Sequence, residues 1–159
     1  MRARRRVLGA HAFEQRLATL AEIFETDGDV LVDDVRSARR RRVRIEVEAP
    51  GYGLPRSATY EYEEWYRGTA GGWTLTDYQY EVRLGPPPSG RKAYHWHDDF
   101  FHFHCEDSGG PEAVDHYRGY VVDLLEDARP DFLAIHALGR VDCSGLHPLR
   151  RRGRDIARA

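Results

Sequence analysis

The chain has few cysteines, a single lysine and no long apolar run. Its two cysteines, Cys105 and Cys143, do not form a Cys-x-x-Cys pair, which argues against a disulfide framework or a cysteine-rich zinc module, so we expect free thiols. No segment approaches the ~20 apolar residues that a bilayer-spanning helix needs, and the N-terminus lacks the apolar core of a secretory signal. We therefore expect a cytoplasmic protein without a membrane partner.

The length and the residue pattern predict one folded unit. With 159 residues, the chain is long enough for a single hydrophobic core, and it contains no internal repeat. We predict a basic N-terminal segment at 1–9, a single α+β domain at 10–138, and an arginine-rich tail at 139–159.

Arginine carries nearly all the positive charge, because Lys92 is the only lysine. Runs of arginine lie near both ends of the chain, and an internal run comprises Arg39, Arg40, Arg41 and Arg42. Arginine binds phosphate through two parallel hydrogen bonds, so such runs can contact nucleic acid. The terminal runs can equally be solvated tails, and the internal run is the one that we expect to have a fixed geometry.

Residue periodicity predicts the secondary structure. Apolar residues at helical spacing predict a helix over 10–26, and alternation predicts strands over 30–35, 43–48, 58–67 and 73–84. A proline near the start of an apolar stripe predicts a second helix over 113–128, and the apolar run 131–138 is interpreted as a strand. The sum is an α+β fold: an antiparallel meander of about five strands with the two helices on one face.

The stretch from Tyr94 to Cys105 is the part of the chain richest in reactive side chains. It holds four of the eight histidines as two His-x-His pairs, His95 with His97 and His102 with His104. In a strand, residues two apart share a face. If Asp98 and Asp99 form a two-residue hairpin turn, His95 lies opposite His102 and all four imidazoles share the sheet face away from the helices, or its edge. His116, His136 and His147 are scattered, and we expect them to be structural or exposed.

One interpretation of these histidines is a zinc or other transition-metal site, since neutral imidazole is a common metal ligand. The metal motif of cupin barrels has a glutamate shortly after His-x-His. Here Asp98, Asp99 and two phenylalanines follow His97, and no glutamate lies at that offset. We therefore predict no metal and no other cofactor.

A second interpretation is metal-independent cleavage of RNA. One histidine would take the proton of a 2′-hydroxyl and another would protonate the leaving 5′-oxygen, each transfer contributing roughly 10² to 10⁴-fold. Arg91 and Lys92 directly precede the stretch and would stabilise the phosphorane charge. Most of the aromatic residues in the stretch are expected in the core. The remaining alternative, polar histidines on a solvent-facing strand, accounts poorly for two same-face pairs within ten residues.

The order of elements and these residues together resemble the toxin of TumE-type bacterial toxin–antitoxin pairs. The matching pieces cover about residues 59–127: a tyrosine-rich strand at 78–82, an aromatic-Asp pair within 94–99, a histidine stretch at 101–104, and a segment rich in leucine and acidic residues at 123–127.

The resemblance implies a ribonuclease-like or otherwise translation-inhibiting toxin, neutralised by a DNA-binding antitoxin. On this mapping His102 and His104 are the centre of the site, supported by His95, His97 and Asp98. We predict RNA contacts from Arg91, Lys92 and Arg39 to Arg42. The alternative function is a non-catalytic metal-binding or protein-interaction module built on the histidine cluster.

Overall fold

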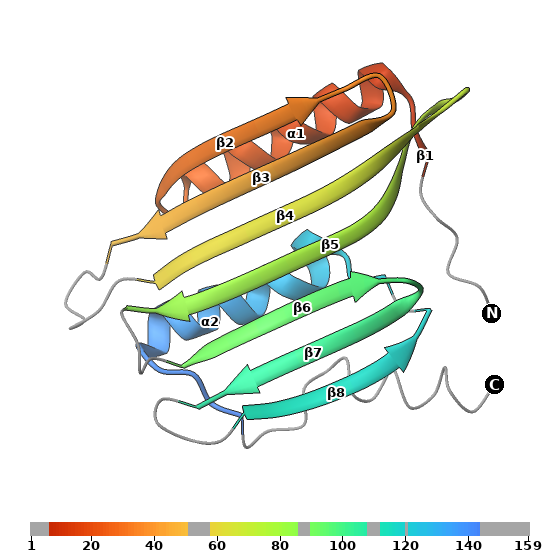
Figure 1. Cartoon of the computed structure of the whole chain (residues 1–159). Helices are drawn as coiled ribbons and strands as arrows, with labels where there is room; N and C mark the ends of the chain where they lie inside the picture. Colours follow the sequence, from red (N-terminus) through yellow and green to blue (C-terminus); the bar gives the residue numbers. More distant parts are fainter. Residues whose placement is uncertain (1–6, 51–57, 86–89, 108–111, 120, 144–159) are drawn as a thin grey trace.

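A computed structural model describes residues 7–50, 58–85, 90–107, 112–119 and 121–143. The fold is α+β, with an antiparallel sheet whose strands follow one another in the order β2 to β8 while β1 pairs with β5 (Figure 1). The strands are β1 (Val7–Leu8), β2 (Asp29–Arg36), β3 (Arg40–Ala49), β4 (Ala58–Thr69), β5 (Gly72–Leu84), β6 (Arg91–His97), β7 (Phe100–Glu106) and β8 (Glu112–Arg118). The helices are α1 (Ala10–Glu25), the π-helical turn η1 (Leu124–Ala128) and α2 (Arg129–Leu138).

The predicted fold class and the antiparallel meander are confirmed, but the predicted number of about five strands is wrong. The described residues form a sheet of eight strands. The hairpin formed by β6 and β7 contributes two strands from one histidine-rich stretch, and β8 comes from a segment that we predicted to be helical.

The predicted first helix is confirmed as α1. Phe13, Leu20 and Phe24 are buried along one side of it, as the helical spacing requires. Phe24 stacks on Tyr62 of β4 with ring centroids 4.7 Å apart, and Phe13 meets Tyr66 edge-on at 4.8 Å. Aromatic contacts of this kind add to the burial of apolar area and hold α1 against the sheet.

The predicted helix over 113–128 is wrong, because its first part is strand β8. Residues 112–118 pair with β7 in a continuous antiparallel register. The apolar residues of this segment fit helical spacing, yet the edge of β7 offers backbone groups that only a strand can pair. Gly119, in the left-handed conformation with φ of 69°, ends the strand.

The predicted strand over 131–138 is also wrong, because these residues form α2. Asp123 caps the preceding η1 turn by accepting hydrogen bonds from the amides of Leu125 and Glu126. Pro130 does not end a helix but lies in the first turn of α2, where its missing amide hydrogen costs nothing. Phe132 and Ile135, three residues apart, are the buried side of this helix.

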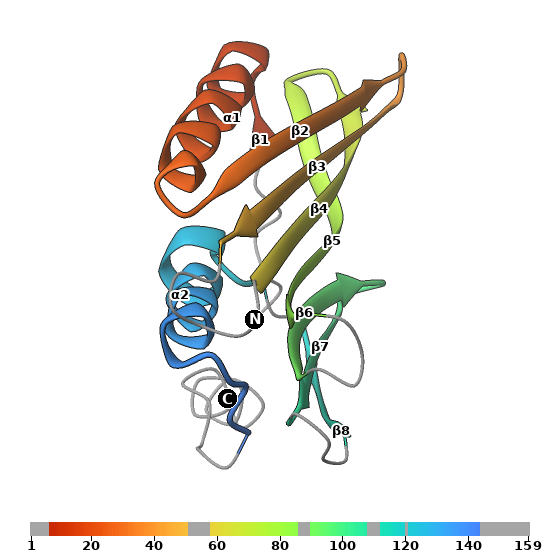
Figure 2. The same ribbon diagram turned by 90° about the vertical axis from the view of Figure 1, so that its left-hand side faces the viewer.

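The sheet has one face toward the helices and one open face. Both helices lie on the same side of the sheet (Figure 2). Phe132 of α2 approaches Tyr62, the same residue that α1 contacts, with ring centroids 5.2 Å apart. The other face carries none of the described helices, and we call it the open face.

A charged network is buried on the helix-facing side. The carboxylate of Glu64 accepts two hydrogen bonds from the Arg16 guanidinium, at 2.7 and 2.8 Å. The hydroxyls of Tyr66 and Tyr80 also donate to it. Burial alone would raise the pKa of Glu64, but the ion pair with Arg16 and these donors lower it, so Glu64 is ionised.

The expectation of free thiols is wrong, because Cys105 of β7 and Cys143 form a disulfide across 38 residues of sequence. The bond ties the segment after α2 to the sheet, where Val141 is also buried. None of the described helices has the length and apolar content needed to cross a bilayer. The cytoplasmic location stays a prediction, and the disulfide weighs against it because such bonds persist mainly in oxidising compartments.

Candidate functional site

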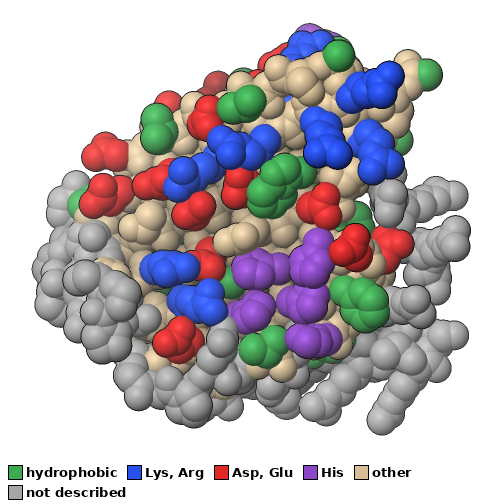
Figure 3. Space-filling model, viewed as in Figure 1, with side chains coloured by type: hydrophobic (Ala, Val, Ile, Leu, Met, Phe, Trp, Pro, Cys, Tyr) green, Lys and Arg blue, Asp and Glu red, His purple; other side chains and the backbone are tan. Residues whose placement is uncertain are grey.

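The hairpin of β6 and β7 places the histidines as predicted. Asp98 and Asp99 form its two-residue turn, both with positive φ, 52° and 62°. This is the geometry of the turn whose twist matches that of antiparallel strands. The register sets His95 directly opposite His102. His95, His97, His102 and His104 therefore share the open face, where the histidines gather over β6 to β8 (Figure 3).

Strand β8 adds a fifth imidazole, His116, which lies opposite His102. The two rings meet with centroids 4.4 Å apart. His97 stacks on His102 at 4.7 Å, and His95 contacts His104 at 4.8 Å. We call these five residues the histidine cluster. The sequence interpretation missed His116 because it assigned the segment to a helix, and residues 112–118 do not alternate between apolar and polar in a way that would have indicated a strand.

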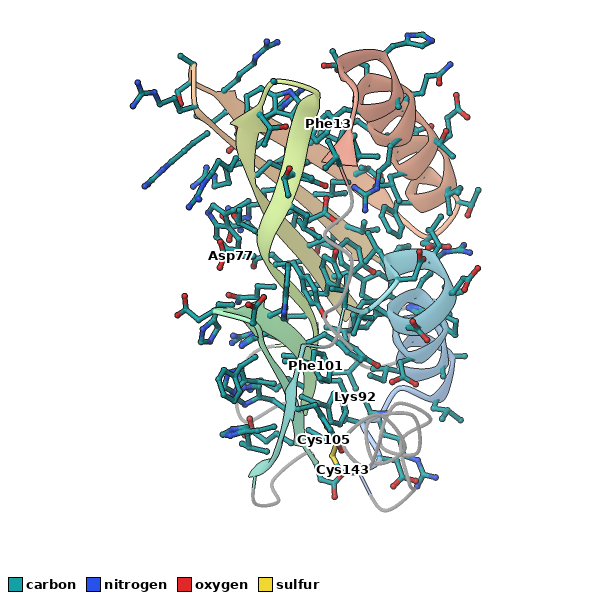
Figure 4. The ribbon with its side chains drawn as sticks, turned by 90° about the vertical axis from the view of Figure 1, so that its right-hand side faces the viewer. Phe13, Asp77, Lys92, Phe101, Cys105 and Cys143 are labelled. Atoms are coloured by element: carbon teal, nitrogen blue, oxygen red, sulfur yellow. A yellow bond between two sulfur atoms is a disulfide. The ribbon has the colours of Figure 1, made fainter. Side chains whose placement is uncertain are left out.

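The reverse side of the hairpin is a rigid aromatic layer. Tyr94, Trp96, Phe101 and Phe103 are buried there, which confirms the expectation that most of the aromatic residues are core. Phe101 points toward the helix side of the sheet in Figure 4. Phe100 is the exception and is exposed on the side of the histidines. Packing on one side of the hairpin therefore fixes the backbone that carries the imidazoles on the other.

Two members of the histidine cluster are held neutral. Burial, reinforced by His104 and Arg91, lowers the pKa of His95 from 6.5 to about 4. Burial and the neighbouring His116 and His97 lower the pKa of His102 as well. The Nε2 atoms of both rings are buried and, within the part of the chain that the structure describes, have no hydrogen-bond partner. Each of these two neutral imidazoles therefore has one ring nitrogen that no described residue engages.

Asp98 lies at the rim of the histidine cluster. Its carboxylate is 3.6 Å from Nδ1 of His97, and both side chains are well exposed. At that distance the contact is electrostatic rather than a hydrogen bond. Asp98 therefore does not fix the orientation of the His97 ring.

The two basic residues before the hairpin point to opposite sides. Arg91 lies in the same alternating row as His95 and donates hydrogen bonds to Glu81 and Glu106, each at 3.2 Å. Lys92 points toward the helices, with its ammonium 3.6 Å from Asp131 (Figure 4). Only Arg91 therefore lies on the side of the histidine cluster.

The internal arginine run is also divided between the two faces. Arg41 is buried, with its guanidinium 4.0 Å from the ring of Phe13, and pairs with Asp34 and with Glu14. Arg40 and Arg42 alternate with it and belong to the open face, where the basic side chains gather above the histidines (Figure 3). Arg39 is exposed at the β2–β3 turn.

A shallow groove of about 320 Å³ borders the histidine cluster. It is lined by Trp65, Asp77, Tyr78, Gln79, His95, Trp96 and His97. Asp77 projects to the open side of the sheet in Figure 4. Among the described residues, no three histidine, cysteine, aspartate or glutamate side chains are arranged to hold a metal ion. The groove thus offers aromatic, carboxylate and imidazole groups to a ligand.

We compared the chain with protein-family models, curated proteins and solved structures. No protein-family model matches the chain, and neither a curated protein nor a solved structure is significantly similar to it. The function must therefore be argued from the site itself.

Proposed function

We propose that the histidine cluster is the active site of a metal-independent ribonuclease with a toxin-like role. The observation that supports the proposal best is the packing of five imidazoles on an open, rigid sheet face, two of them with a lowered pKa and an unpartnered Nε2 atom. Neutral imidazoles accept protons and protonated ones donate them, so a cluster can supply both partners of acid–base catalysis.

In the proposed reaction, the neutral imidazole of His102 takes the proton of an RNA 2′-hydroxyl. The 2′-oxygen then bonds to the adjacent phosphorus, and the bond from phosphorus to the 5′-oxygen breaks. Protonated His104 supplies the proton that the leaving oxygen needs. The products are a 2′,3′-cyclic phosphate and a free 5′-hydroxyl.

The spacing of the rings supports this division of roles. The centroids of His102 and His104 are 6.5 Å apart, wider than the 4.4 to 4.8 Å of the rings in direct contact. In the proposal, the scissile phosphate lies over this pair and contacts both rings. Arg91 lies on this side of the sheet and pairs with Glu81 and Glu106, so its charge stabilises the phosphorane only if it exchanges one of these carboxylates for the phosphate. His95, His97 and Asp98 position the pair, as does His116.

The test uses purified protein, an RNA of mixed sequence and EDTA in the buffer. We expect cleavage to produce 2′,3′-cyclic phosphate ends, and His102→Ala or His104→Ala to slow it by about 10² to 10⁴-fold. His11→Ala, an exposed histidine on α1, is the matched control and should retain the full rate. Unchanged cleavage in both cluster variants would refute the proposal.

A non-catalytic role for the histidine cluster predicts a different result. Zinc that stays bound through dialysis, and is lost when His95, His97, His102 and His104 are all replaced, would support a metal-holding module instead. The wild-type protein would then show no RNA cleavage with or without EDTA.

The resemblance to TumE-type toxins supports a partner as well. We propose that an antitoxin, itself a DNA-binding protein, neutralises this chain. Expression of the chain alone should arrest growth through the histidine cluster, and co-expression of a small helix-turn-helix protein encoded beside it should restore growth. Growth arrest that co-expression does not relieve would contradict the antitoxin proposal, and arrest that persists in the His102→Ala variant would contradict the role of the histidine cluster.

A further inference from the structure

The groove beside the histidine cluster continues into a second hollow on the open face. This second hollow, of about 370 Å³, has Arg40, Arg42, Trp65, Arg67 and Asp77 among its lining residues. Trp65 and Asp77 line both hollows. A ligand can therefore lie across the open face from the histidines to the arginines without leaving the surface.

The arginine end of this path holds an unusual pair. Arg40 of β3 and Arg67 of β4 are directly opposite in the sheet, and both are exposed. Like charges in that position repel and destabilise a sheet. Neighbouring Arg42 is neutralised by Asp33 at 2.9 Å and Glu63 at 3.5 Å. Within the described residues, Arg40 and Arg67 have no acidic partner, so an anion bound between them would relieve the repulsion.

The middle of the path combines an indole with a carboxylate. Trp65 is only partly buried, whereas Trp73 and Trp96 are core residues. Its backbone carbonyl accepts a hydrogen bond from the Thr76 hydroxyl at 3.0 Å, and the ladder shifts register just after it. A partly exposed aromatic ring beside arginines on an open sheet is the usual platform for an unpaired base.

Asp77 is the cross-strand neighbour of Trp65, and it forms no ion pair with any other described residue. An ionised carboxylate can only accept hydrogen bonds. Guanine is the base whose Watson–Crick edge presents two adjacent N–H donors, from N1 and the N2 amino group. A base stacked on Trp65 with that edge toward Asp77 would satisfy both groups.

We infer that this path is a subsite for single-stranded RNA, with a guanine on Trp65 and Asp77 and its phosphate between Arg40 and Arg67. The inference rests on the proposed function for its link to cleavage. Trp65 on β4 and His95 on β6 are two strand spacings apart, roughly 10 Å, and both line the groove beside the histidine cluster. The recognised guanine therefore lies a short distance along the strand from the scissile phosphate, and cleavage occurs at a fixed offset from it.

The test measures binding of 2′-O-methyl oligonucleotides, which lack the nucleophile for cleavage. A uridine hexamer containing one guanine is compared with the all-uridine hexamer by fluorescence anisotropy at several salt concentrations. We expect tighter binding of the guanine oligonucleotide. Asp77→Asn should remove that preference, which amounts to about 5- to 150-fold. Trp65→Ala should weaken binding by a similar factor, and Trp65→Phe should retain most of the affinity.

The arginine pair is tested by its salt dependence. Replacing Arg40 and Arg67 by alanine should reduce the slope of log affinity against log salt by about one. Arg140→Ala, an exposed arginine after α2, is the matched control and should leave the slope unchanged. Equal binding of the two hexamers by the wild-type protein would overturn the guanine assignment. Wild-type affinity in the Trp65→Ala variant would overturn the subsite.

Failure of the subsite and failure of the ribonuclease proposal are distinguishable, because these oligonucleotides cannot be cleaved. Guanine-dependent binding through Trp65, with full cleavage by both the His102→Ala and the His104→Ala variants, would support the subsite and refute the catalytic proposal. If cleavage is lost in the His102→Ala variant, but the wild-type protein does not cleave at a fixed offset from guanine, the catalytic proposal is supported and the subsite is refuted.

Discussion

Acidification should destabilise this protein through His95. Burial, together with His104 and Arg91, lowers the pKa of His95 from 6.5 to about 4 in the folded state. In the unfolded chain the imidazole regains its ordinary pKa and binds a proton more readily. The free energy of unfolding is therefore highest above pH 6.5, falls as the pH drops from 6.5 to 4, and receives no further loss from this residue below 4.

The size of the effect follows from the two pKa values. A difference of one pKa unit corresponds to about 1.4 kcal/mol, so the shift of His95 limits its contribution to about 3 kcal/mol. That loss is a large part of the 5 to 15 kcal/mol that keeps a typical domain folded.

The assay is urea unfolding at intervals between pH 7.5 and 4, on the wild-type protein and on His95→Asn, which cannot titrate. Carboxylates also titrate in this range, but they do so in both proteins, so the difference between the two curves isolates His95. The variant should lose up to about 3 kcal/mol less than the wild type on acidification. His11→Asn, which alters an exposed imidazole, should follow the wild-type curve. Parallel curves for the wild type and His95→Asn would refute the reasoning.

Three further predictions concern stability. Cys143→Ser should lower the free energy of unfolding by about 4 kcal/mol, because the disulfide closes a loop of 38 residues. The reduced wild-type protein should show the same loss in urea unfolding. A loss of less than about 1 kcal/mol would contradict the disulfide. Glu64→Gln should cost about 3 to 5 kcal/mol in urea unfolding, because Arg16 loses its buried counter-charge, whereas Glu22→Gln on the exposed side of α1 should cost almost nothing. Asp99→Gly should raise the melting temperature by stabilising the turn by about 0.5 to 1 kcal/mol, because φ of 62° suits glycine; a decrease would contradict this.

The histidine face could be predicted from sequence because its geometry is local. A two-residue turn at Asp98 and Asp99 sets the register of the hairpin, and alternation then assigns every side chain to a face. The same alternation contained the information that Arg41 points inward with Val43, although a run of four arginines looks uniform in composition. Where the turn residues and the alternation of side chains indicate the same register, the sequence is sufficient to predict which residues share a face.

The C-terminal third could not be predicted because its conformation depends on distant residues. The segment 112–118 carries apolar residues compatible with either period, and the unpaired edge of β7 decides in favour of a strand. The short apolar run of α2 is equally ambiguous, and Phe132 becomes helical while packing against Tyr60 and Tyr62. The partner of Cys105 lies 38 residues away, and nothing near either cysteine indicates it.

The consecutive strand order also affects how the molecule folds. Each strand from β2 to β8 pairs with the next strand along the chain, so the sheet can grow hairpin by hairpin with little entropy lost to long loops. The exception is β1, which pairs with β5 although β2, β3 and β4 lie between the two in the sequence. We expect the central hairpins to form early, and the attachment of β1 and of the segment around Cys143 to complete the fold.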